Sequence, residues 1–147
     1  MADSIHIYSQ YMASLQNKEI DWDSDTFGLM LCGAGYTPDQ SSHRYKSSVT
    51  SEVTGDGYAA GGITLTGVTL TYDSANKRYT VSADPVLWED ASLDASYAVL
   101  YDKTPATDAT RPLVLYIVLN PVRSPENGNL GFTWNPSGIF RFSIVES

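Results

Sequence analysis

The segment that most constrains the fold is a glycine-rich stretch at residues 52–62, EVTGDGYAAGG. Its four glycines, Gly55, Gly57, Gly61 and Gly62, let the backbone take positive φ angles repeatedly over a short distance. The sequence that follows, ITLTGVTLTY, alternates apolar residues with threonine, which is typical of a half-buried strand. We therefore expect a shaped loop that leads into a β-strand, and the glycines carry turn chemistry rather than reactive groups.

The alternation in residues 63–72 changes phase at Gly67, because its apolar residues are odd-numbered before that glycine and even-numbered after it. One extra residue in a strand moves every later side chain to the opposite face. A β-bulge at Gly67 would keep a single buried face. The pattern therefore predicts one bulged strand over residues 63–72.

Short apolar runs separated by turn residues recur along the rest of the chain. Residues 27–32 form the first such run, and a polar, proline-containing segment at residues 35–51 predicts a long ordered loop. Residues 113–119 are apolar at every position, so this strand is either central in a sandwich or covered by another subunit. Turns are predicted at Asn127-Gly128 and at residues 135–138.

This spacing of strands and turns predicts an all-β fold, an antiparallel β-sandwich of seven to nine strands. A chain of 147 residues is the length of one ordinary domain, and about two-thirds of its unfolded surface can be buried. We expect a single domain over residues 1–147, without internal repeats or linkers.

Residues 1–20 are expected to form an N-terminal helix or arm, the only helix that the pattern predicts. Four apolar residues lie three, four and three positions apart, on one face of a short helix: Ile5, Tyr8, Met12 and Leu15. Asp3 or Ser4 would accept hydrogen bonds from its first amides. A strand over residues 5–8 is the alternative, and the segment could also order on a neighbouring subunit.

Composition limits the classes of partner. The formal net charge of −8 argues against sequence-independent binding of nucleic acid, which needs lysine and arginine to displace counterions from phosphates. No apolar run approaches the roughly 20 residues of a membrane-spanning helix, and the N-terminus lacks a basic leader followed by an apolar core. The single cysteine, Cys32, lies in an apolar run and is expected to be a small buried hydrophobe.

Two acidic clusters are candidate sites by residue type. Paired carboxylates flank Trp88 and fit glycoside hydrolysis by residue type: Asp84, Glu89 and Asp90. A loop with solvated acids and a buried tryptophan anchor fits the same residues better. Three alternating aspartates, Asp21, Asp23 and Asp25, could hold Ca²⁺, but the glycine and terminal glutamate of an EF-hand are missing. We therefore expect no catalytic residue and no metal.

Other catalytic and cofactor chemistry has little support. His6 and His43, the only histidines, have no cysteine or acid at ligand spacing and are expected to be polar surface. The GxSxG elbow of serine hydrolases is absent. The glycines of residues 52–62 precede no helix and lack the P-loop lysine, so no nucleotide site and no cofactor is expected.

Six segments, taken in order along the chain, carry a family resemblance: NKEIDWDSDTFGLMLC, YTPDQSSHRY, EVTGDGYAAGG, WEDASLDASYAVLYD, PLVLYIVLN and NGNLGFTWNPSGI. Together they resemble a family of small tailed-bacteriophage virion structural proteins, known as head decoration (cement) or tail proteins, with an EVTGxGYxxGG motif. The resemblance covers residues from about 15 to 144. The chain departs from the family at Gly28, where a bulkier residue is usual in the first strand.

The resemblance implies a non-enzymatic virion protein that assembles in the host cytoplasm. The expected function is capsid decoration, in which the protein binds the outside of the head as a homo-oligomer, a trimer being one candidate order. Its partners would be the major capsid protein and copies of itself. The alternatives are a neck- or tail-associated structural protein and a host-glycan-binding fibre domain, since tyrosine and tryptophan faces also stack on sugars. The expected contact residues are Tyr8, Tyr11, Met12, Tyr58 and Tyr116.

Overall fold

The computed structural model describes residues 3–143. Within this range the chain forms ten strands, one α-helix and two short 3₁₀ helices: β1 (Ser4–Ile7), α1 (Tyr11–Gln16), β2 (Phe27–Cys32), η1 (Lys46–Ser48), β3 (Ile63–Thr64), β4 (Thr69–Asp73), β5 (Arg78–Ser82), β6 (Val86–Ala91), β7 (Ala95–Asp102), η2 (Asp108–Thr110), β8 (Leu113–Arg123), β9 (Gly128–Phe132) and β10 (Phe140–Ser143).

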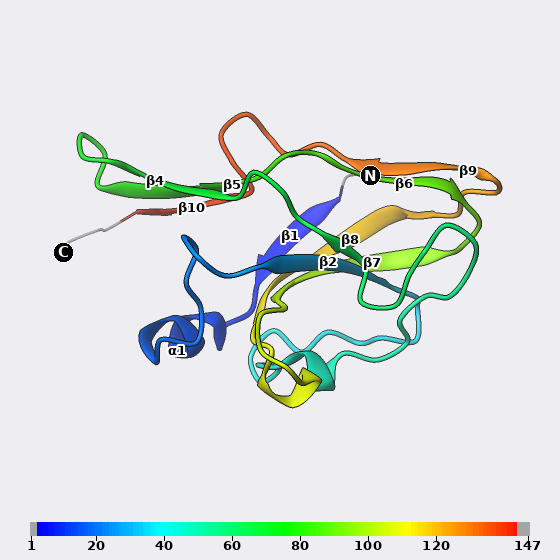
Figure 1. Ribbon diagram of the computed structural model, residues 1–147, viewed down its shortest axis with the longest axis horizontal. Helices are drawn as coiled ribbons and strands as arrows, with labels where there is room; N and C mark the ends of the chain where they lie inside the picture. Colours follow the sequence, from blue (N-terminus) through cyan, green and yellow to red (C-terminus); the bar gives the residue numbers. More distant parts are fainter. Residues whose placement is uncertain (1–2, 144–147) are drawn as a thin grey trace.

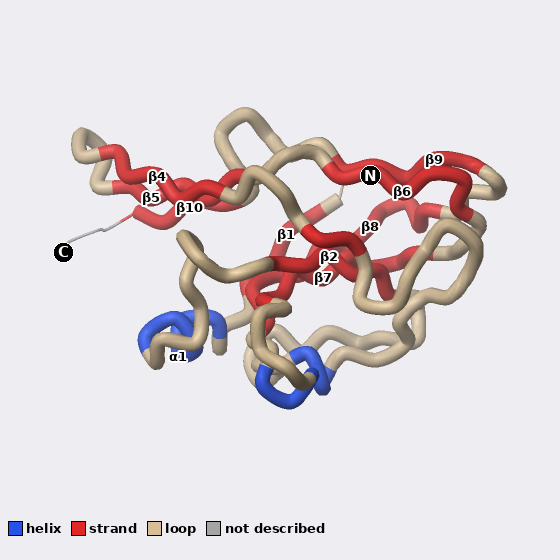
Figure 2. The backbone as a smooth tube through the Cα atoms, viewed as in Figure 1, coloured by secondary structure: helices blue, strands red, loops and turns tan. Residues whose placement is uncertain are grey.

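The strands form three antiparallel sheets arranged as a sandwich (Figure 1). One layer is a five-stranded sheet with the order β1-β8-β7-β2-β3. The other layer consists of a three-stranded sheet, β10-β5-β4, and the pair β6-β9, which lie end to end along the top of Figure 2. The all-β sandwich expected from the sequence is confirmed, with ten strands in the described part of the chain instead of seven to nine.

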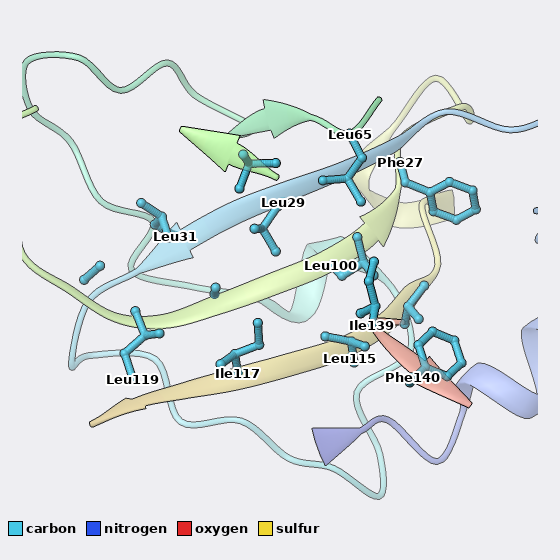
Figure 3. Close-up of a cluster of buried hydrophobic side chains, with 14 of the residues drawn as sticks. Phe27, Leu29, Leu31, Leu65, Leu100, Leu115, Ile117, Leu119, Ile139 and Phe140 are labelled. Carbon is cyan, nitrogen blue, oxygen red and sulfur yellow. The ribbon is translucent and has the colours of Figure 1, made fainter. Parts of the chain in front are cut away.

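The main core fills the space between the two layers. The leucine, isoleucine and phenylalanine side chains that β2, β7 and β8 contribute to this cluster are labelled in Figure 3. Val81, Val86, Trp88 and Leu130 join the same cluster from the opposite layer. Leu29, Leu31 and Leu100 are fully buried. One continuous cluster therefore joins side chains from all three sheets.

The opposite face of the five-stranded sheet is also covered. Tyr8, Met30, Val99, Leu113 and Tyr116 form a second buried cluster there, with Tyr36 supplied by the segment at residues 35–51. That segment is an ordered covering loop, as expected. The double-faced strand at residues 113–119 is thus central in the sandwich, and both of its faces are buried by this chain itself.

The N-terminus differs from the expected helix. Ser4–Ile7 forms strand β1, which pairs with β8 in the register Ser4↔Val118 to Ile7↔Leu115, and α1 starts only at Tyr11. The strand alternative for residues 5–8 is therefore the correct one. The physical reason is the open edge of β8: pairing there satisfies backbone groups on both strands, which a helical turn at these residues would leave on an uncovered edge.

The prediction of a single bulged strand over residues 63–72 was wrong. Ile63 pairs with Leu29 in the five-stranded sheet, whereas Leu70 pairs with Val81 in the three-stranded sheet. Gly67 has a φ of 63° and lies where the chain crosses between the sheets. The phase change in the alternation therefore results from a change of sheet. A bulge within one sheet would produce the same sequence pattern, which is why the prediction failed.

The glycine-rich segment at residues 52–62 is held in place by hydrogen bonds to β2 and β7. The Glu52 carboxylate accepts hydrogen bonds from the Tyr58 hydroxyl and the Gly61 amide, both at 2.6 Å. The Tyr58 hydroxyl in turn accepts one from the Leu31 amide at 3.1 Å. The Tyr101 hydroxyl donates to the Gly61 carbonyl at 2.6 Å. The segment is a structural clasp, as its turn chemistry indicates.

The packing of Tyr101 accounts for the glycine at position 28 of β2. A Cβ at this position would lie 3.0 Å from the ring of Tyr101. This ring lies over Gly28, and its hydroxyl bonds the Gly61 carbonyl. The strand is intact, since Gly28 pairs with both Tyr101 and Thr64. A tyrosine on the neighbouring strand therefore supplies the side-chain contact that glycine lacks.

We expect Gly62→Ala to lower the free energy of unfolding by at least about 2 kcal/mol, since it forces a strained φ on alanine and adds a steric clash. Gly62 has a φ of 81°, and a Cβ there would lie 2.0 Å from the Leu29 carbonyl oxygen. The measurement is equilibrium unfolding in urea. Gly128→Ala is the matched control, because its Cβ would meet nothing closer than 3.8 Å. Equal unfolding midpoints for the two variants would contradict the close approach.

Candidate docking surfaces

The three-stranded sheet β10-β5-β4 is amphipathic across its whole width. The register pairs Val81 with both Leu70 and Phe140, and Tyr79 with both Tyr72 and Phe142. All six of these side chains lie on one face, because alternate residues of paired strands share a face. The other face carries only polar side chains: Thr69, Thr71, Asp73, Arg78, Thr80, Ser82, Arg141 and Ser143.

The body of the protein covers only part of this apolar face. Phe140 packs edge-on against Tyr11 with a centroid distance of 5.9 Å, and Phe140 and Val81 are both buried. Towards the hairpin tip the cover ends, since Tyr72 is 54% exposed and Tyr79 is 40% exposed. Figure 1 shows the β4–β5 hairpin reaching past the five-stranded sheet. The distal half of the face is an exposed apolar surface.

An apolar groove of about 280 Å³ lies between α1 and this sheet. Its lining comes from both sides: Tyr11, Met12, Leu15, Trp22, Leu70, Tyr79, Val81 and Phe142. The two buried polar groups in the lining satisfy each other, because the Trp22 indole donates a hydrogen bond to the Tyr11 hydroxyl at 2.8 Å. Burial also raises the pKa of Tyr11 to about 12, so this hydroxyl stays neutral. The groove therefore favours apolar side chains.

A second, smaller groove of about 190 Å³ lies between β1 and the segment that joins β9 to β10. It mixes aromatic and polar lining, with Phe132 and Trp134 stacked at a centroid distance of 6.4 Å beside Asp3, Thr133 and Asn135. The Trp134 indole donates to the Asp84 carbonyl at 3.1 Å, which fixes the orientation of its ring. This arrangement offers a flat aromatic surface next to hydrogen-bonding groups.

Only one of the five expected contact residues lies open on a docking surface. Met12 is 39% exposed at the rim of the larger groove. Tyr8, Tyr11 and Tyr116 are buried inside the subunit, with exposed fractions of 0%, 1% and 8%. Tyr58 is half-buried and serves the clasp through Glu52. The three buried tyrosines therefore present almost no surface to another chain.

Sequence reasoning missed Leu70, Tyr72 and Tyr79 as surface residues. Their signal was present, because TLTYD and RYTVS alternate in period two around the turn at residues 74–77. The sequence does not show that the β4–β5 hairpin extends beyond the edge of the core. Without that placement, the same alternation predicts an ordinary half-buried strand pair.

The acids around Trp88 do not form a shared site. Asp84, Glu89 and Asp90 are all exposed, and the Asp84 carboxylate accepts a hydrogen bond from the Thr66 hydroxyl at 3.2 Å. Trp88 is buried and packs against Tyr58 with a centroid distance of 6.1 Å. The acids are exposed and the tryptophan is buried, as expected, but the expected loop is wrong, because Trp88, Glu89 and Asp90 lie on strand β6.

The aspartates near residue 23 bond to their own backbone. The Asp21 carboxylate accepts from the Asp23 amide at 2.9 Å, and the Asp25 carboxylate accepts from the Asp21 amide at 3.0 Å. Between residues 3 and 143, no three histidine, cysteine or acidic side chains are grouped so as to hold a metal ion. Cys32 is fully buried, as expected, and burial raises the pKa of its thiol to about 12.

The histidines contact tyrosines of the outer cluster. The His6 ring stacks on Tyr116 at 5.1 Å, and His43 Nδ1 lies 3.0 Å from the Tyr36 hydroxyl, which bonds the Tyr8 hydroxyl at 2.7 Å. Both histidines therefore help to fasten the covering segment and the N-terminal strand, a role beyond that of plain polar surface.

Comparisons with known proteins gave no match: no family model, no curated protein and no solved structure is similar to this chain. Among the helices in residues 3–143, none has the length and apolar character needed to cross a membrane.

Asp102, at the end of β7, is a buried carboxyl group with incomplete partners. Its side chain is 0% exposed, and Oδ2 accepts no hydrogen bond from the described residues, whereas the Thr104 amide donates to Oδ1 at 3.0 Å. Burial raises the pKa of Asp102 to about 7, and the neighbouring Asp25 carboxyl group adds to the rise. A protonated Asp102 can donate a hydrogen bond to Asp25, so the pair is satisfied only while it shares a proton.

We expect this pair to make the protein less stable as the pH rises from about 4 to about 7. The folded-state pKa of Asp102 lies above the ordinary value of 3.8, so the unfolded chain loses its proton first and gains stability over this range. Asp102→Asn removes the penalty and should raise the free energy of unfolding at pH 8 by an amount on the order of 2–4 kcal/mol. Urea unfolding at pH 4 and pH 8 measures it.

The matched control for this pH experiment is Asp94→Asn, at an exposed position. It should leave both the stability and its pH dependence close to those of the parent protein. A parent-like pH dependence in Asp102→Asn would contradict the proton-sharing pair.

Proposed function

We propose that this chain is a bacteriophage virion structural protein, a capsid decoration (cement) subunit that stabilises the head by binding its outer surface. The resemblance of residues 15–144 to tailed-phage virion proteins supports the phage particle as the setting. The observation that carries the docking role is the apolar groove between α1 and the projecting sheet, with Met12 exposed at its rim. The function needs no chemical step.

Burial of apolar surface supplies the binding free energy in this proposal. Each Å² of apolar area removed from water contributes about 25 cal/mol. The α1 side of the groove, with the exposed Met12 at its rim, is the part that contacts the shell in this proposal. Many equivalent sites on a symmetric shell would add avidity, provided that the subunits also contact one another. The net charge of −8 keeps free subunits soluble before assembly.

A neck or tail position in the particle uses the same contacts on a different surface. Measuring binding to heads and to tails separately distinguishes the two positions, because only a decoration subunit binds heads that lack it.

The test is co-sedimentation of the purified protein with heads of the encoding phage that lack this subunit. We expect saturable binding, and we expect Met12→Asp to weaken it at least tenfold, because a carboxylate at the groove rim must be desolvated. Leu87→Asp is the control, since Leu87 is 46% exposed on β6 away from the groove. An absence of binding to heads would overturn decoration, and equal loss in the two variants would exclude the groove as the contact.

The smaller groove supports a second candidate function, binding of a host glycan. Trp134 and Phe132 offer an aromatic surface for a sugar ring, with Asp3 and Asn135 beside it as hydrogen-bonding groups. On a glycan array this function predicts binding that Trp134→Ala abolishes and that Met12→Asp leaves unchanged. An array without any bound glycan would remove this candidate.

A further inference from the structure

Strand β4 is an open edge of the projecting sheet. The strand order β10-β5-β4 places β4 at the end of its sheet, and its five residues are all exposed. An edge strand presents unpaired backbone amides and carbonyls along one side. The sequence TLTYD therefore offers a ready hydrogen-bonding partner to another strand.

This edge lacks the devices that usually prevent edge pairing. Natural edges are blocked by proline, lysine, bulges or charges that point towards the apolar face. TLTYD contains no proline, lysine or glycine, and its pairing with β5 runs without a register shift from Thr69 to Asp73. Its only charge, Asp73, lies on the polar face and bonds the Asn76 side chain at 2.7 Å and the Ala75 amide at 3.0 Å.

We propose that β4 pairs with β4 of a second copy of this chain, antiparallel and about a two-fold axis at Thr71. Antiparallel pairing of an edge with itself is isologous, so the same residues serve both copies. Centring the axis on Thr71 uses all five residues, with Thr71 opposite Thr71, Leu70 opposite Tyr72 and Thr69 opposite Asp73. The two three-stranded sheets then form one six-stranded sheet.

This register is complementary in both polarity and charge. The two Leu70–Tyr72 pairs lie on the apolar face and the Thr69–Asp73 pairs lie on the polar face, so neither face is mixed. Asp73 faces a threonine and never its own copy, which avoids opposing like charges. Threonine opposite threonine is a favourable cross-strand pair, and tyrosine opposite leucine buries apolar area on the shared face.

The same pairing closes one side of the apolar groove. Leu70 lines the groove, and the partner's Tyr72 becomes its direct cross-strand neighbour on the same face. The ring of the partner's Tyr72 then covers the β4 side of the groove, which in the single chain is open. The rim at Met12, on α1, stays accessible, so self-pairing and shell binding use different ends of the groove. The inference thus details the self-association part of the proposed function and does not depend on the phage shell.

Cysteine cross-linking tests the register directly. In Thr71→Cys the two thiols lie opposite each other, where cross-strand Cβ atoms are about 4.5–5.5 Å apart, so mild oxidation should convert most of the protein to a covalent dimer. Thr69→Cys is the matched control, because its two copies would be about 13 Å apart, four residues along the strand. The native Cys32 does not interfere, since it is fully buried.

Light scattering on the reduced, unmodified protein measures the assembly itself. We expect a mass of twice the 16.1 kDa chain, and we expect Tyr72→Lys to weaken the dimer at least tenfold by placing a charge on the shared apolar face. A monomer or a trimer, or equal cross-linking of Thr69→Cys and Thr71→Cys, would overturn the inference. A circular dichroism spectrum like that of the parent shows that Tyr72→Lys still folds.

The outcome is separable from that of the proposed function. Loss of dimer with retained head binding by Tyr72→Lys supports both statements. A clean Thr71 cross-link in a protein that never binds heads keeps the self-pairing and overturns decoration.

Discussion

The structure depends on the burial of both faces of one five-stranded sheet. Strands β7 and β8 are apolar on both faces, so other parts of the chain must cover each face. The two faces are covered by different kinds of structure. Two small sheets cover one face through a conventional apolar core. A long loop fastened by tyrosine, histidine and lysine contacts covers the other, with Lys46 over the Tyr101 ring and paired with Asp108 at 3.3 Å. The five-stranded sheet is therefore held from both sides.

That constraint explains how much the sequence could predict. Residues 27–32 and 113–119 were recognisable as strands because unbroken apolar runs bounded by turns have few other folds available. The N-terminal strand was not, since Ser4 and Ile5 are exposed and none of its four residues is fully buried. Only pairing with the open edge of β8 decides between helix and strand there. Likewise, nothing local to Gly67 tells a bulge from a crossing between sheets.

The candidate docking surfaces, too, were only partly predictable from the sequence. Sequence reasoning expected contacts from Met12, which is exposed, and from tyrosines chosen by residue type, of which Tyr8, Tyr11 and Tyr116 are buried. Aromatic residues serve cores and interfaces equally well, so their type does not locate them. The surface that the structure reveals comes from an amphipathic sheet extending beyond the body that covers its inner half, a property of the tertiary arrangement. The buried Asp102 was equally invisible, because only the fold brings it beside Asp25.

The three-stranded sheet joins strands that are made at different times. The ribosome releases β4 and β5 long before residues 140–143, which complete the apolar face with Phe140 and Phe142. A nascent chain thus carries the edge strand without the finished sheet behind it. Until β10 has been added, β5 is a second open edge of the same sheet, so the finished sheet exists only after residues 140–143 have been synthesised.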